Sequence, residues 1–109
     1  MTGERKKDGL IEEFYDNGQF RSKKNWKDGK LDGLQETYYE NGQLKYKENC
    51  KNDKEDGPWE SYYDNGQLEK KGNNKAGKKD GLWEYYDEEG NLTKTEEWKD
   101  GKLIPFKKT

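Results

Sequence analysis

The chain has 109 residues, of which 42% are charged and 26% hydrophobic, and its mean hydropathy is −1.74. So few apolar residues exclude a thick core, and the 14% that are aromatic must supply most of the buried area. A net charge of −2 and a pI near 5.4 give no electrostatic attraction to nucleic acid or to an anionic membrane, so neither is an expected partner.

The residue types that carry most familiar enzyme chemistry are missing. The chain has no histidine and a single cysteine, Cys50, which excludes Cys/His zinc sites, Ser-His triads, Cys-His dyads and an intramolecular disulfide. We therefore predict a non-enzymatic protein without cofactor or metal, in which Cys50 fills space. The N-terminal MTGERKKDG has no apolar signal-peptide core and no stretch is long enough to span a membrane, which predicts a cytoplasmic protein.

The chain is organised as four repeats. After an N-terminal tail at residues 1–7, an Asp-Gly pair recurs every 24 residues, and a further glycine stands ten residues after each of these aspartates. A fixed period of this length predicts a solenoid-like array in one domain. The units span residues 8–31, 32–55, 56–79 and 80–103, and residues 104–109 form a C-terminal strand or tail.

Each of the first three units contains an Asn-Gly pair between two runs of alternating polarity. Such a pair predicts a β-hairpin with a two-residue type I′ turn. In the second unit the resulting register sets Tyr39 opposite Leu44 and Glu36 opposite Lys47. The equivalent predictions in the first and third units are Tyr15–Phe20, Glu12–Lys23, Tyr63–Leu68 and Glu60–Lys71.

The junctions between units carry a second series of turn dipeptides, which predicts two-residue hairpins there too. They set Trp26 opposite Leu31, Cys50 opposite Glu55, Asn74 opposite Lys79 and Trp98 opposite Leu103. Hairpins joined by hairpins make an antiparallel meander. The predicted fold is therefore all-β: an elongated single-layer antiparallel sheet of about eight strands, with a ninth over Leu103 to Phe106.

The fourth unit departs from this pattern. It reads DGLWEYYDEEGNL, one residue short before its tyrosine pair and one residue long in the turn. A three-residue loop over Glu88, Glu89 and Gly90 would set Tyr86 opposite Leu92, but Trp83 would then point to the other face unless the strand carries a bulge. The sequence leaves both alternatives open, and a modified terminal cap is a third.

A single-layer sheet leaves its apolar rows uncovered, so these rows are the candidate binding surface. We expect Tyr15, Tyr39, Tyr63 and Tyr86 to form one stripe with Phe20, Leu44, Leu68 and Leu92, and we expect Trp59 to cover Gly72. The alternative is that the stripe is only the sheet's own thin core. The predicted partner-binding residues are Tyr15, Tyr39, Trp59, Tyr63, Trp83 and Tyr86.

These rows predict a non-enzymatic scaffold for protein–protein interaction or for self-association as a homodimer. Aromatic repeats with glycine turns are also similar to carbohydrate-binding and choline-binding arrays, so a carbohydrate or cell-wall ligand is the alternative. Peripheral lipid binding is a weaker alternative because the pI is 5.4. The recurring carboxylates pair with lysines in the predicted register and are expected to be surface ion pairs.

The pattern dG-x-W-x-x-YY-x-NG-x-L, which ends in runs such as NWKDGKLDG, resembles MORN repeats. The resemblance covers residues 8–103 and is greatest to the bacterial variant type found in YwqK-family antitoxins. It implies one hairpin per repeat in an elongated antiparallel sheet, with roles in protein binding, dimerisation and, in some members, lipid contact. Ile11 and Gln35 stand where Trp59 and Trp83 stand in the later units, and the first two units therefore lack the family's tryptophan.

Overall fold

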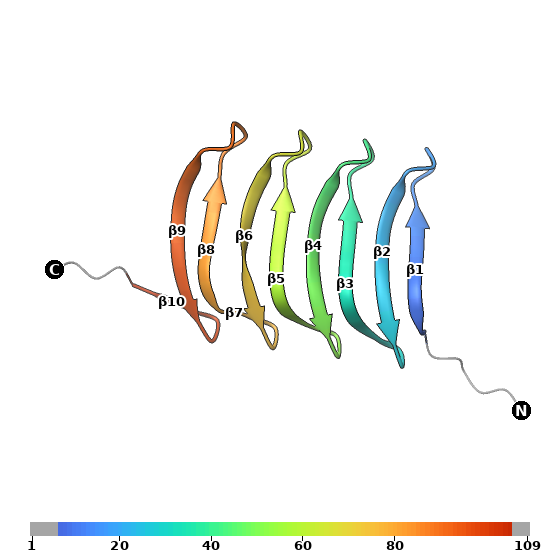
Figure 1. The fold of residues 1–109 in the computed structure, drawn as a ribbon, viewed down its shortest axis with the longest axis horizontal. Helices are drawn as coiled ribbons and strands as arrows, with labels where there is room; N and C mark the ends of the chain where they lie inside the picture. The colour runs from blue at the N-terminus through green and yellow to red at the C-terminus, as the bar shows by residue number, and fades with distance from the viewer. Residues whose placement is uncertain (1–6, 106–109) are drawn as a thin grey trace, which may run out of the picture.

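The computed structural model describes residues 7–105, which form a single open antiparallel sheet in meander order (Figure 1). The predicted fold class is confirmed. Most of the predicted tail at residues 1–7, and Phe106 of the predicted last strand, lie outside the described residues. The strands are β1 (Gly9–Phe14), β2 (Phe20–Lys27), β3 (Lys30–Tyr38), β4 (Leu44–Lys51), β5 (Lys54–Tyr62), β6 (Leu68–Lys75), β7 (Lys78–Lys79), β8 (Gly81–Tyr86), β9 (Leu92–Lys99) and β10 (Lys102–Ile104).

β7 and β8 together occupy the place of one strand. Both pair with β6, and the Asp80 amide between them donates to the carbonyl of Asn73 at 2.9 Å. The ten assigned strands therefore fill nine positions across the sheet.

The junction hairpins have the predicted register and the type I′ geometry. Trp26 pairs with Leu31, Cys50 with Glu55, Asn74 with Lys79 and Trp98 with Leu103, as predicted. Both central residues of each turn have positive φ, for example 51° at Asp28 and 81° at Gly29. Aspartate, asparagine and glycine tolerate this left-handed conformation, which is why the dipeptides direct the turn.

The Asn-Gly turns are of another kind, and the type I′ prediction is wrong for them. In the second unit only Gly42 has positive φ, at 91°. The Tyr39 amide donates to the carbonyl of Gln43 at 2.8 Å, and the Gly42 amide donates to the carbonyl of Tyr39 at 3.0 Å. The loop thus has three residues and ends in a left-handed glycine. The Asn41 side chain stabilises it by accepting a hydrogen bond from the Gln43 amide at 2.8 Å.

A β-bulge compensates for the longer loop. Lys45 is an extra residue between two ladders, so Tyr38 and not Tyr39 pairs with Leu44, while Glu36 still pairs with Lys47. The predicted tyrosine pairs are therefore wrong, and the predicted glutamate–lysine pairs are confirmed. The first and third units follow the same pattern, with the pairs Phe14–Phe20, Glu12–Lys23, Tyr62–Leu68 and Glu60–Lys71.

The fourth unit does not depart from this arrangement. Its loop, Glu88 to Gly90, has the same hydrogen bonds, Tyr86 pairs with Leu92 as predicted, and the register shifts by one residue after Tyr85. The alternative with a bulge is correct, and all four units carry it. The fourth unit looked different because its tyrosine pair, Tyr85 and Tyr86, was compared with the tyrosine pair of the third unit. At a spacing of 24 it corresponds instead to Ser61 and Tyr62.

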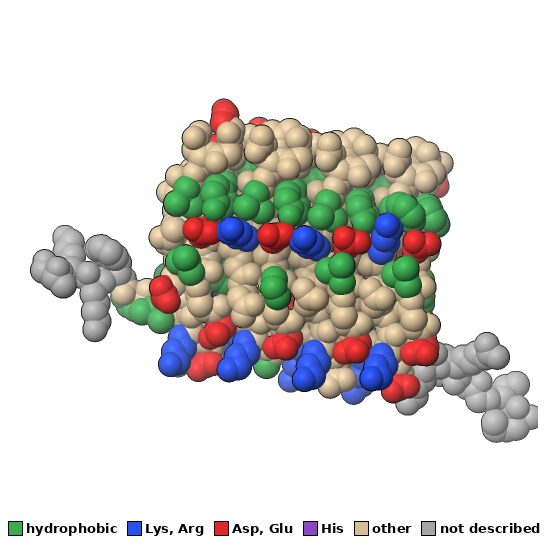
Figure 2. Space-filling model, viewed as in Figure 1, with side chains coloured by type: hydrophobic (Ala, Val, Ile, Leu, Met, Phe, Trp, Pro, Cys, Tyr) green, Lys and Arg blue, Asp and Glu red, His purple; other side chains and the backbone are tan. Residues whose placement is uncertain are grey.

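The two faces of the sheet differ in burial. We call the packed face the one that carries Trp83 and its neighbours, and the open face the one drawn toward the reader in Figure 2. The described side chains that are less than a tenth exposed all lie on the packed face: Ser22, Gln35, Cys50, Ser61, Asn74 and Trp83. The exposed large apolar side chains of β1, β3, β8 and β9, at 40–55% exposure, lie on the open face: Leu10, Phe14, Leu34, Leu82 and Leu92.

Candidate functional site

The middle of the open face is a row of charges that alternate in sign from strand to strand (Figure 2). Directly paired residues of adjacent strands share a face, so the registers place one charged residue of each strand in this row. The Lys47 ammonium lies 3.2 Å from the Glu60 carboxylate, and the Lys71 ammonium 3.7 Å from Glu84. The charge row consists of Glu12, Lys23, Glu36, Lys47, Glu60, Lys71 and Glu84.

An aromatic and aliphatic row lies beside the charge row, toward the three-residue loops. Phe14 and Phe20 stack with their ring centroids 4.8 Å apart, and the Lys23 ammonium lies 4.1 Å from the centroid of Phe20. The Tyr62 hydroxyl donates to Glu60 at 2.7 Å. The loop-side row consists of Phe14, Phe20, Tyr38, Leu44, Tyr62, Leu68, Tyr86 and Leu92.

The hydrogen bond between Tyr62 and Glu60 joins these two rows and contributes to opposite shifts of their pKa values. Burial and then the hydrogen bond to Glu60 raise the pKa of Tyr62 to about 12. Burial alone would raise the pKa of Glu60, but the hydrogen bonds from Tyr62 and Lys47 outweigh it and the net shift is downward. At neutral pH Tyr62 therefore stays protonated and Glu60 stays charged.

A second, interrupted apolar row lies on the other side of the charge row. Leu10 pairs with Asn25, Leu34 with Asn49, Pro58 with Asn73 and Leu82 with Glu97. The Leu10, Leu34 and Leu82 side chains are 40–55% exposed. The open face thus combines two apolar rows with a central charge row, and nothing within residues 7–105 covers it.

The predicted stripe of four tyrosines does not exist. Tyr38 and Tyr39 are consecutive, so they point to opposite faces; Tyr38 lies on the open face with Tyr86, whereas Tyr39 lies on the packed face with Tyr15 and Tyr63. The prediction failed because it gave the Asn-Gly loop two residues in place of three. Sequence reasoning therefore missed Phe14, Tyr38 and Tyr62 of the loop-side row.

Tyr15, Tyr39 and Tyr63 instead connect consecutive units. Each hydroxyl donates to a backbone carbonyl 23 residues ahead, at 2.6–2.7 Å. The loop asparagines do the same, for example Asn41 Nδ2 to the Asp64 carbonyl at 2.9 Å. Asp87 occupies the fourth position of the tyrosine column, so the donor series ends with the last unit.

Trp59 and Trp83 lie in the packed face within an aromatic row. Trp59 lies between Tyr46, with centroids 6.0 Å apart, and Trp83, at 5.7 Å. Trp83 is 2% exposed and donates from Nε1 to the Asn73 carbonyl at 3.1 Å. Although Trp59 is the paired neighbour of Gly72, the ring that covers Gly72 is that of Trp83. The prediction about Trp59 is thus corrected, and Trp83 is too buried to contact a partner.

The packed face also contains the one cysteine and a pair of carboxyl groups. Burial, and then the charges of Glu48 and Glu55, raise the pKa of the Cys50 thiol to about 11. Burial and a hydrogen bond with Glu55 raise the pKa of Glu48 to about 7. A thiol with so high a pKa is neutral and a poor nucleophile, and residues 7–105 contain no group of three acidic or cysteine side chains arranged for a metal ion.

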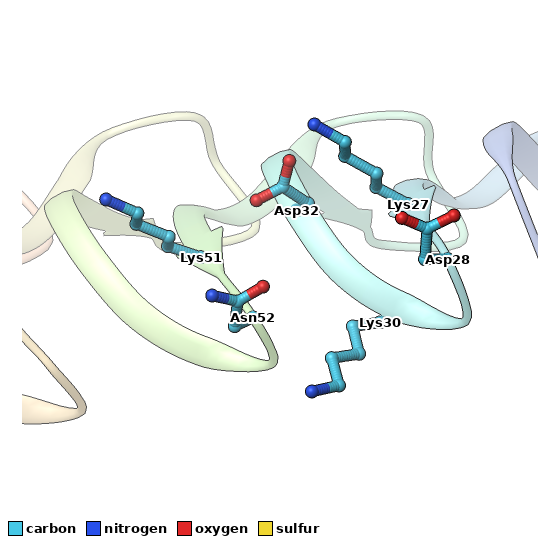
Figure 3. Close-up of a pocket in the computed structure, with 6 residues that line it drawn as sticks. All are labelled: Lys27, Asp28, Lys30, Asp32, Lys51 and Asn52. Atoms are coloured by element: carbon cyan, nitrogen blue, oxygen red, sulfur yellow. The ribbon is translucent and has the colours of Figure 1, made fainter.

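The hollows on the surface are shallow and do not gather reactive groups. Figure 3 shows the one between the first two junction turns, in which Lys27 and Lys30 extend in opposite directions. Residues 7–105 contain no helix that could cross a membrane. Among the described residues the open face is therefore the strongest candidate for a functional surface.

Comparison with known proteins gives one match. The profile of the MORN repeat variant family matches this chain four times, at residues 7–28, 31–52, 55–74 and 79–103. The matches follow the structural repeat, and each contains one hairpin with a three-residue loop and the bulge beside it. A search of curated proteins finds no match.

Proposed function

Since the chain belongs to the MORN repeat variant family, we propose that it is a non-enzymatic scaffold that binds a protein partner through its open face. Repeats of this family are modules consistent with a scaffold or interaction role. The family match covers nearly the whole described chain, so the repeat array is the working part of the molecule and no separate catalytic domain accompanies it within residues 7–105.

One observation carries this proposal: exposed leucine and phenylalanine side chains are concentrated on one face. Leu10, Phe14, Leu34, Leu82 and Leu92 are each at least 40% exposed there. Soluble proteins rarely leave a continuous apolar surface open unless it binds something. The charges between the two apolar rows keep this surface compatible with water and give a partner fixed positions to recognise.

The carbohydrate alternative has less support. Sugar-binding sites need an aromatic ring with a free face, whereas Trp59 lies between two other rings and the Lys70 ammonium lies 5.4 Å from its centroid. Lipid contact gains no support from the structure, because the charge row holds four glutamates and three lysines and so presents no basic surface to an anionic membrane. The relation to YwqK-family antitoxins, a bacterial origin and a cytoplasmic location stay predictions from the sequence.

Affinity capture with matched variants tests the proposal. Leu34→Gln and Leu82→Gln remove exposed apolar area from the open face without adding charge. The control is Lys45→Gln, at an exposed bulge residue whose ammonium lies 5.6 Å from the ring centroid of Tyr39 on the packed face. We expect proteins that bind the wild type and the control to be lost with the leucine variants. Equal capture by all four proteins would refute binding through the open face.

A further inference from the structure

The charge row of the open face has a self-complementary order. We number the strand positions one to eight from β1 to β9 and count β7 and β8 as one position. Glutamates then stand at positions one, three, five and seven, and lysines at positions two, four and six. Position eight holds Thr95, which pairs with Glu84. When two copies of such a surface are stacked face to face, opposite charges meet only in certain relative placements of the strands.

We propose that the partner of the open face is a second copy of this chain, packed face to face about a two-fold axis parallel to the strands between β4 and β5. This inference rests on the proposed function and names its partner. The axis sets position four over position five, three over six and two over seven. Lys47 then lies over Glu60 of the second copy, Glu36 over Lys71 of the second copy, and Lys23 over Glu84 of the second copy.

Two other kinds of two-fold axis place like charges together. A two-fold axis centred on a strand sets odd positions over odd positions, so glutamate meets glutamate. An axis perpendicular to the strands sets each strand over its own copy, with the same result. Like charges facing each other across an interface are strongly unfavourable, so the order of charges selects an axis between two strands. Among such axes, the one between β4 and β5 overlaps all eight strand positions, whereas the one between β3 and β4 overlaps six.

The same axis also brings the apolar rows into register. In the loop-side row, Tyr38 lies over Leu68 of the second copy, and Leu44 over Tyr62 of the second copy, so rings meet aliphatic side chains. On the other side of the charge row, Leu34 lies over Asn73 of the second copy. Large side chains thus face smaller ones, which suits interdigitation of two stacked sheets.

The size of the surface predicts the strength of the association. Two twisted sheets stack well only near the axis, over about six strands, which span roughly 24 Å by about 20 Å at the usual strand spacing. This gives roughly 1,000 Å² of total buried area, near the lower end for specific interfaces. We therefore expect a dimer with a dissociation constant in the micromolar range, weakened by added salt.

Charge reversal with complementation tests the proposed register. Lys47→Glu and Glu60→Lys are each expected to weaken self-association about tenfold or more, because each sets two like-charged pairs across the axis. In a one-to-one mixture of the two variants both pairs are opposite in sign, so association should return. Lys45→Glu, on an exposed bulge residue whose ammonium lies 5.6 Å from the ring centroid of Tyr39 on the packed face, is the control, and far-UV circular dichroism checks that each variant is folded.

Sedimentation from about 10 µM to about 1 mM reads out the result. A wild-type protein that stays monomeric over this range would overturn the self-pairing, as would a dimer that resists both charge reversals or a mixture that does not reassociate. Failure here is separate from failure of the scaffold proposal: a monomer whose captured protein still depends on Leu34 and Leu82 retains the open face as a binding surface for another protein.

Discussion

Replacing Gly72 with alanine tests how the packed face is built. A Cβ at this position would lie 2.1 Å from Cδ2 of Trp83, far inside an ordinary carbon–carbon contact of about 3.5–4 Å. Gly72 does not have the left-handed φ of the turn glycines, so its backbone accepts alanine and the clash is the main cost. The Trp83 ring must move, although it is 2% exposed and hydrogen-bonded to the Asn73 carbonyl.

The magnitude follows from what Trp83 loses. Removing a buried tryptophan costs about 3–5 kcal/mol, and a displaced ring keeps part of its contacts while losing a hydrogen bond that contributes about 1 kcal/mol. Alanine is also better than glycine in a strand by about 0.5–1 kcal/mol. We expect Gly72→Ala to lower the free energy of unfolding by about 2–3 kcal/mol in urea titrations followed by far-UV circular dichroism.

A double-mutant cycle isolates the contact between the two residues. In a Trp83→Ala background no Trp83 ring lies over residue 72, so Gly72→Ala should be neutral or stabilise the protein by up to about 1 kcal/mol. The coupling between the two positions should therefore be about 2–4 kcal/mol. If alanine at position 72 costs as much without the ring as with it, the steric argument is wrong.

Three further predictions concern single contacts and use the same urea titrations. Ala76→Gly should stabilise the protein by about 1 kcal/mol, because alanine is held there at a φ of 51° that costs an L-residue about that much; Lys75→Gly, outside the turn, should destabilise instead. Tyr39→Phe should cost about 1 kcal/mol, because it removes the 2.7 Å hydrogen bond to the next unit; no change would argue against the tyrosine connection. Glu48→Gln should leave stability unchanged near pH 4 and raise it by about 1–2 kcal/mol at pH 8. Burial raises the pKa of Glu48 from 4.5 to about 7, so the wild type loses stability as the pH rises through that window. Because Glu48 is only partly buried, we expect less than the free energy that corresponds to the full pKa shift. A difference between the two proteins that does not change with pH would contradict the last prediction.

The sequence by itself determined the repeat, the junction turns and the glutamate–lysine pairs within each hairpin. The pairs Asp28-Gly29 and Asn52-Asp53 tolerate positive φ at both positions, which leaves few conformations other than a two-residue type I′ turn. Glu36–Lys47 was predicted from a two-residue Asn-Gly loop, and the pair is correct because the three-residue loop and the one-residue bulge offset each other. Cys50–Glu55 follows directly from the two-residue turn at Asn52-Asp53. Local backbone preferences are enough for such features because each depends on adjacent residues only.

The tertiary structure alone decided which aromatic rings share a face. Near the Asn-Gly loops, the face on which a residue lies depends on whether the loop has two or three residues. A three-residue loop is offset by a one-residue bulge, which is Lys45 in the second unit. A shift of one residue reverses the face, which moved Tyr39 to the packed face and Tyr38 to the open one. Likewise, Gly72 of β6 lies between Trp59 of β5 and Trp83 of β8. The packing of the side chains decides that the ring of Trp83, and not that of Trp59, covers it.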